Sequence, residues 1–172
     1  MNNDKFPQRK HPRLDKYDYS KPGYYFLTIC VKERKPILSE IVVNNKHEQQ
    51  QYVAKNDVLL RLSSIGKTVE KYIKNIDISY EHIKVDSYVI MPDHVHILIF
   101  ISPSFDGEPK NDISTNSVIR TLKRLINKAV GCSIWQESYY DHIIRNEDDL
   151  YETRKYILNN PLSWYHKNKL SN

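Results

Sequence analysis

Residues 83–101 read IKVDSYVIMPDHVHILIFI, and this stretch decides the fold. Two runs rich in β-branched and aromatic residues, 83–91 and 94–101, flank the pair Pro92-Asp93. Proline and aspartate are typical of tight connections, so the two runs predict an antiparallel hairpin. Because successive side chains of a strand alternate between its faces, His94 and His96 project from one face. The other face, which we expect to pack on helices, carries Val95, Ile97, Ile99 and Ile101.

Turn-forming residues and the spacing of apolar residues divide most of the remaining chain into predicted strands, helices and loops. Pro22-Gly23 precedes a buried strand over residues 24–31 (YYFLTICV). Residues 57–76 place apolar side chains at helical spacing, which predicts an amphipathic helix capped by Asp57. Residues 118–130 predict another helix, and residues 134–144 an extended segment. The polar stretches 44–51 and 102–117 are interpreted as loops, the second of them mobile.

A final helix is predicted to begin after Asn146, which caps an acidic first turn of Glu147, Asp148 and Asp149. Pro161 is expected to end this helix. Tyr156 and Asn160 are four residues apart and therefore neighbours on one surface. That surface, shared with Asp149, Glu152 and Thr153, lies opposite a mainly apolar stripe of Leu150, Tyr151, Arg154, Ile157 and Leu158.

The predicted order is strand, helix, strand, strand, helix, strand, with one helix added at the end. This is the ferredoxin-like βαββαβ arrangement, an α+β fold with an antiparallel sheet. At 172 residues the chain is expected to form one domain, 1–172, in which residues 1–20 make a basic, extended N-terminal arm.

Composition limits the class of protein. The N-terminus has no apolar signal core, and no apolar run approaches the roughly 20 residues that span a bilayer. Cys30 and Cys132 have no zinc-type spacing. We therefore expect a soluble, cytoplasmic protein that does not bind membranes.

The chain is basic, with a net charge of +5 and a pI of about 9.0, which favours a polyanionic partner. Arg120, Arg124 and Lys128 follow one another at four-residue spacing on the helix 118–130. Such a stripe suits a phosphate backbone, although an ordinary solvated helix face has the same pattern.

The histidine pair is the first candidate for chemistry. Two imidazoles two residues apart on a strand can converge on one divalent ion, because neutral imidazole nitrogen is a good ligand. The alternative is a pair of ordinary strand histidines that are hydrogen-bonded at a half-covered face. A histidine-triad hydrolase is disfavoured, because Leu98 stands where its third histidine would be, and the paired HxS or HxT motifs of a two-histidine phosphoesterase are missing.

Tyr156 is the candidate nucleophile. A phenol can attack a phosphodiester when a divalent cation polarises the phosphate, and the resulting phosphotyrosine keeps the bond energy for rejoining. No nucleotide cofactor is then needed. The amide oxygen of Asn160 is a hypothetical third metal ligand beside the two imidazoles.

Three blocks of sequence, MPDHVH (91–96), WQESYYDHIIRN (135–146) and YILNNP (156–161), together resemble the REP-associated tyrosine transposases. These belong to the HUH single-strand transposases, named for two histidines around a hydrophobic residue. The segments Arg13-Leu14 and 24–31 are also similar, so the resemblance covers nearly the whole chain.

The resemblance implies that His94 and His96 bind the metal, Mg²⁺ or Mn²⁺, that Asn160 is its third contact, and that Tyr156 is the nucleophile. It implies cleavage of single-stranded DNA beside an imperfect hairpin, which leaves a 5′-phosphotyrosine and a free 3′ hydroxyl. We expect the protein to act as a monomer or a homodimer. The residues expected to contact DNA are Arg13, Arg120, Arg124, Lys128, Trp135, His142 and Arg145.

Two alternatives remain. A non-catalytic single-stranded nucleic-acid-binding ferredoxin-like module would stack bases on Trp135, Tyr139 and Tyr140 and would need neither Tyr156 nor metal. A relaxase or replication initiator would share the histidine pair, but its tyrosine usually lies near the N-terminus of a longer chain. The order here, with the histidines first and the tyrosine last, is against that class.

Overall fold

The computed structural model describes residues 17–43, 57–103 and 113–169. Its main sheet has four strands in the order β4-β5-β1-β6, and each neighbouring pair is antiparallel. The strands are β1 (Gly23–Cys30), β4 (Ile83–Ile90), β5 (His94–Ile101) and β6 (Tyr140–Ile143). The predicted hairpin joins β4 to β5 and the predicted first strand is β1, so the ferredoxin-like α+β fold is confirmed.

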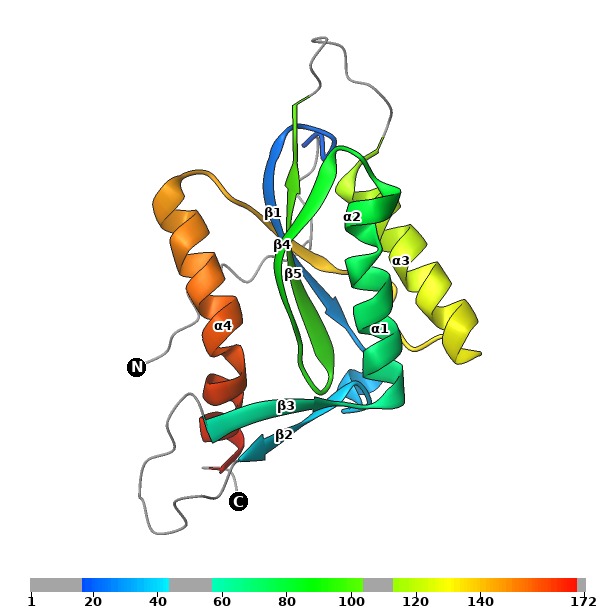
Figure 1. Cartoon of the computed structure of the whole chain (residues 1–172), viewed down its shortest axis with the longest axis vertical. Coiled ribbons are helices and arrows are strands. Elements are labelled where there is room, and N and C mark those ends of the chain that lie inside the picture. The colour runs from blue at the N-terminus through cyan, green and yellow to red at the C-terminus, as the bar shows by residue number, and fades with distance from the viewer. Residues whose placement is uncertain (1–16, 44–56, 104–112, 170–172) are drawn as a thin grey trace.

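Helices cover both faces of this sheet (Figure 1). On one face α1 (Ser64–Lys74), followed by the short α2 (Ile76–Ser79), lies beside α3 (Thr115–Val130). The larger core lies here, where Val95, Ile97 and Ile99 of β5 pack with apolar residues of both long helices. On the other face lies α4 (Glu147–Lys169), over a smaller core that contains Phe26, Leu98 and Ile157. The histidine strand thus has helices on each side.

The prediction of one helix over residues 57–76 is wrong in its first part. Residues 58–62 form β3 (Val58–Leu62), which pairs with β2 (Ser39–Val43) in a two-stranded ribbon. The helix that follows is capped by Ser63, whose side chain accepts the Gly66 N–H at 3.0 Å, and not by Asp57. Pairing with β2 decides the outcome, because it satisfies the backbone N–H and C=O groups that a helix would otherwise satisfy. Buried and less buried side chains then alternate along the strand.

The last helix also differs from its prediction. Asn146 caps it as expected, through an Asp149 N–H to Asn146 Oδ1 hydrogen bond of 2.8 Å. However, α4 continues through Pro161 for two further turns. Proline in a helix removes one backbone donor and crowds the carbonyl four residues before it. Trp164 packs on the smaller core, as Ile41 and Leu60 of the ribbon also do, and this burial stabilises the part of α4 beyond the proline.

The face of α4 that is buried shares only Leu150 and Ile157 with the predicted apolar stripe. The buried side chains are Leu150, Thr153, Ile157 and Asn160, whereas Tyr151 and Leu158 are about two thirds exposed. Two polar residues therefore point toward the sheet.

Several other expectations concern loops and termini. The loop at 44–51 and most of the loop at 102–117 lie outside the described residues, but α3 begins at Thr115, three residues earlier than predicted. Most of the N-terminal arm also lies outside them; at its end Tyr19 is buried, and its hydroxyl donates to Asp141 at 2.9 Å. Within the described residues, no helix is both long and apolar enough to cross a membrane.

Candidate active site

The two histidines lie at the start of β5, on the face of the sheet that α4 covers. Both are buried, and their Nε2 atoms are 3.0 Å apart. Their neighbours across the sheet are Cys30 and Thr28 of β1. The strand alternation predicted from the sequence therefore brings the two imidazoles together at one point.

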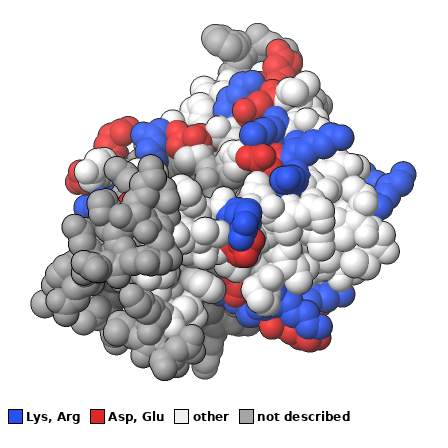
Figure 2. Space-filling view, turned by 60° about the horizontal axis from the view of Figure 1, so that its bottom comes forward, with Lys and Arg blue, Asp and Glu red and all other residues white. Residues whose placement is uncertain are grey.

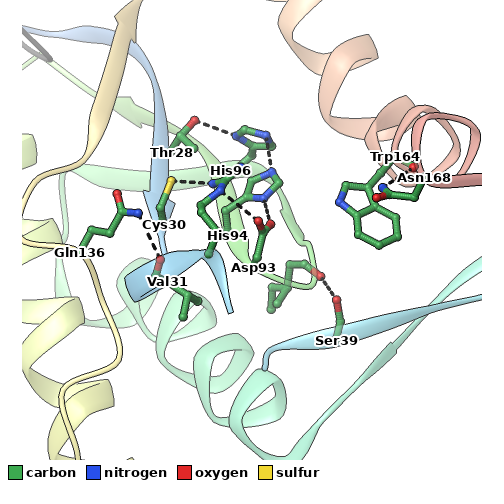
Figure 3. A network of polar contacts seen from close by, with 12 residues as sticks. Thr28, Cys30, Val31, Ser39, Asp93, His94, His96, Gln136, Trp164 and Asn168 are labelled. Carbon is green, nitrogen blue, oxygen red and sulfur yellow. Dashed lines mark hydrogen bonds and ion pairs between the residues drawn. The ribbon is translucent and has the colours of Figure 1, made fainter. Parts of the chain in front are cut away.

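The outer ring nitrogen of each histidine has a polar partner of its own. His94 Nδ1 is 2.5 Å from Asp93 Oδ1, and His96 Nδ1 is 2.8 Å from Thr28 Oγ1. Figure 3 shows these contacts in line, from Thr28 through His96 and His94 to Asp93. When each Nδ1–H donates to its oxygen partner, each Nε2 keeps a lone pair, and both lone pairs face the same point.

Asp93 is itself held by Arg34. The Arg34 Nε atom lies 3.0 Å from Asp93 Oδ2, and Arg34 Nη1 donates to the Cys30 sulfur at 2.9 Å. Arg34 and Glu33 both adopt left-handed backbone conformations, with φ of 54° and 55°. This conformation is costly for non-glycine residues and concentrates at functional sites. Here the turn brings the guanidinium back over the end of β1.

The electrostatics favour neutral imidazole at His96. Burial, reinforced by the neighbouring His94 and Arg34, lowers the pKa of His96 well below its ordinary value. Burial alone would raise the pKa of Asp93, but its contacts with His94 and Arg34 outweigh burial and leave that pKa below the ordinary value. Asp93 is therefore an anion that orients a ring, and His96 keeps the uncharged form that ligates metals.

Tyr156 reaches the histidines from α4. Its ring packs edge-on against His96, with centroids 5.3 Å apart, and against Phe26, with centroids 5.8 Å apart. Phe26 also stacks on His96 at 5.1 Å. Tyr156 is 36% exposed, so one side of it faces solvent. Asn160, one turn further along α4, is buried.

Two polar contacts hold the first half of α4 in place. Arg154 makes a two-point ion pair with Asp86, which stands at a bulge in β4, and its guanidinium lies over the ring of Tyr24. The Arg154 hydrogen bonds lower the pKa of Asp86 against the effect of its partial burial. At the start of the helix, His142 Nε2 lies 2.8 Å from Asp149 Oδ1.

The structure separates most residues expected to contact DNA from the histidines. Arg120, Arg124 and Lys128 are exposed, but on α3, across the sheet from α4. In the view of Figure 2, Lys and Arg side chains lie among acidic ones and form no continuous basic field. Arg145 is exposed in the turn before α4, and Arg13 lies outside the described residues.

Three residues expected to contact nucleic acid are instead engaged within the protein. Trp135 and Tyr139 are 3% exposed and belong to the larger core, so neither ring offers a surface to a base. His142, also expected to contact DNA, is hydrogen-bonded to the carboxylate of Asp149.

Sequence reasoning did not find Thr28, Phe26, Arg34 or the contact role of Asp93. Asp93 precedes the first histidine, which is a local signal. The others depend on the pairing of β1 with β5 and on a strained turn, neither of which is visible in a single sequence.

A family model described as "Transposase IS200 like" matches residues 20–160, which include both histidines, Tyr156 and Asn160. The chain belongs to the IS200-like transposase family. This membership confirms the resemblance to tyrosine transposases and the assignment to an enzyme class of HUH-type DNA strand transferases.

Two relatives and one solved structure are similar to this chain. A Haemophilus influenzae protein described as uncharacterized is 29% identical over 91% of this chain and 89% of its own length. A REP-associated tyrosine transposase of Escherichia coli is 29% identical over 46% of this chain and 44% of its own length. The solved structure of a REP-associated tyrosine transposase bound to a REP hairpin superposes with a TM-score of 0.57 at 22% identity, covering 88% of this chain and 73% of that one. That likeness supports the fold.

Proposed function

We propose that this IS200-like transposase is a metal-dependent single-strand DNA endonuclease and strand transferase that cuts beside DNA hairpins through a 5′-phosphotyrosine on Tyr156. The observation that carries the proposal is the contact of the Tyr156 ring with one of two buried histidines whose Nε2 atoms lie 3.0 Å apart. The hairpin substrate is proposed from the solved relative, which is bound to a REP hairpin. We expect the protein to act in the cytoplasm, as a monomer or a homodimer.

The donor set suits a divalent ion. Two ligands that each lie about 2.1 Å from an ion, at a right angle to each other, are about 3.0 Å apart. The Nε2 separation is 3.0 Å. The described residues contain no cluster of three or more His, Cys, Asp or Glu side chains, so any further ligand among them would be another kind of group. Asn160, on the buried face of α4, is the proposed third protein ligand, and DNA oxygens and water would complete the set.

The bound ion would polarise the scissile phosphate. Thr28 and Asp93 keep the two rings oriented, and Phe26 with His96 fixes the plane of the phenol. The Tyr156 oxygen then forms a bond to phosphorus as the bond between phosphorus and the 3′ oxygen breaks. The phenol proton leaves to solvent, and the departing 3′ oxygen takes up a proton as a hydroxyl. Reversal with a different 3′ hydroxyl joins a new strand.

The test mixes the protein with hairpin oligonucleotides that carry single-stranded flanks, in Mg²⁺ or Mn²⁺, and looks for a covalent adduct on a denaturing gel. Wild type and Tyr151→Phe, a matched change at an exposed tyrosine of the same helix, should form the adduct; Tyr156→Phe should not. The double variant His94→Ala, His96→Ala should lose metal-dependent cleavage. DNA binding without any wild-type adduct would instead establish the non-catalytic binding module.

A further inference from the structure

The sheet face that carries the histidines is unevenly covered. On its β4–β5 side, Val89, Met91 and Leu98 are buried in the smaller core beneath α4. On the β6 side, Tyr140 is 55% exposed. Because β6 is an edge strand next to β1, Tyr140 stands at the open margin of the face that holds the candidate active site.

Strand register places Tyr140 in the same cross-strand row as the site. Tyr140 is the Cα partner of Thr28, and Thr28 is the Cα partner of His96. Residues paired in this way project from the same face of a sheet. Strands lie about 4.8 Å apart, so the backbone at Tyr140 is about 10 Å from that at His96. At 3.4 Å per stacked base, this distance corresponds to about three nucleotides.

Neighbouring residues on β6 have internal partners, whereas the Tyr140 ring offers a surface. Tyr139 and Asp141 face the larger core, where they contact Asn116 and Tyr19. His142 shares the face of Tyr140 but is bound to Asp149. Among the three aromatic residues that sequence reasoning considered for base stacking, only Tyr140 is exposed.

We propose that Tyr140 is a stacking platform for one base of the single-stranded DNA held at the candidate active site, within about three nucleotides of the scissile phosphate. The inference rests on the proposed function, because it takes His94 and His96 as the place where that phosphate is held. Single-stranded DNA is the occupant that the chemistry favours: the chain has a net charge of +5, and an exposed phenol ring stacks on any base without sequence preference.

The experiment measures the dissociation constant of hairpin oligonucleotides with a single abasic site placed in turn at each flanking position. Base–aromatic stacking corresponds to a loss of about 5- to 150-fold in affinity when the ring is removed. Tyr140→Leu should show such a loss on intact DNA, whereas Tyr140→Phe, which keeps the ring, should bind like wild type. Tyr151→Leu, at an exposed tyrosine on the outer side of α4, is the matched control and should also bind like wild type.

One abasic position should weaken wild type and Tyr140→Phe but cause no further loss in Tyr140→Leu. Equal affinities of Tyr140→Leu and Tyr151→Leu on intact DNA would overturn the inference. So would a Tyr140→Leu defect that stays the same factor at every abasic position, because the ring would then have no particular base as partner. Covalent adduct formation by the wild type is scored in parallel. If no adduct forms, the proposed function is refuted. If the adduct forms but one of these two refuting results is found, only the stacking role of Tyr140 is refuted.

Discussion

Substitution of Asp93 by asparagine tests whether the carboxylate that contacts the His94 ring strengthens metal binding by the histidine pair. The carboxylate accepts from His94 Nδ1 at 2.5 Å and pairs with Arg34 Nε at 3.0 Å. Asparagine keeps the shape but loses the charge that both partners face. Removing an outer-shell partner of a ligating histidine typically costs about 10- to 100-fold in metal affinity, or about 1.4 to 2.8 kcal/mol. We expect the Mn²⁺ concentration for half-maximal adduct formation to rise by this factor.

The assay titrates Mn²⁺ at saturating hairpin DNA and follows the initial rate of covalent adduct formation. At saturating metal the rate of Asp93→Asn should approach that of wild type, because Tyr156 and both imidazoles are unchanged. Asp77→Asn is the matched control: Asp77 accepts the Val85 N–H at 2.7 Å, but it lies in α2, away from the histidines. If Asp93→Asn and Asp77→Asn give the same half-maximal concentration as wild type, the proposed orienting role of Asp93 is refuted.

Three further outcomes are expected. Mn²⁺ should support adduct formation at lower concentration than Mg²⁺, because two nitrogen ligands suit a transition ion better than an ion that prefers oxygen; equal or reversed titration midpoints would contradict a site built on two imidazoles. Gly66→Ala should lower the free energy of unfolding by about 3 kcal/mol in denaturant titrations, because the added Cβ would stand 2.0 Å from the carbonyl oxygen of Leu38. An unchanged unfolding midpoint would show that α1 does not pack so closely on the backbone of Leu38. Arg154→Met should lower the free energy of unfolding by about 1 kcal/mol or less at neutral pH, since its ion pair with Asp86 is partly exposed. Because the pKa of Asp86 is lowered in the folded state, this loss of stability should shrink as the pH falls below about 4. A loss that grew in acid would refute the ion pair as its cause.

The parts of the fold that could be predicted from sequence are those with strong local periodicity. The alternation of HVHILIFI fixes which face the histidines occupy, and the register with β1 agrees with it. The amphipathic helix over 118–130 is likewise present within α3. The orientation of the last helix could not be predicted in this way. Tyr156 and Asn160 were predicted to lie opposite the apolar stripe, but Asn160 is buried and the Tyr156 ring contacts Phe26 of the smaller core.

The failures share one physical cause, which is that tertiary contacts overrode local signals. VLLRL at 58–62 fits helical spacing as well as a strand, and only its pairing with β2 decides between them. Pro161 is a strong stop signal, yet the helix continues and Trp164 beyond the proline packs on the smaller core. Trp135 and Tyr139 read as stacking aromatics because their burial depends on the distant helix α3.

Two separate sets of contacts hold the two halves of the candidate site, the histidine pair and the helix that carries Tyr156. The histidine pair proposed to bind the metal is held within the sheet and its connecting turns, through Thr28, Asp93 and Arg34. The proposed nucleophile, Tyr156, is on a helix held by other contacts: Arg154 binds Asp86 at the β4 bulge, and Trp164 packs on the smaller core. The two halves of the site come into contact where Phe26 and His96 touch the ring of Tyr156. A change in the sheet contacts should therefore alter metal affinity, whereas a change in the helix anchors should alter the rate of attack at a given metal occupancy.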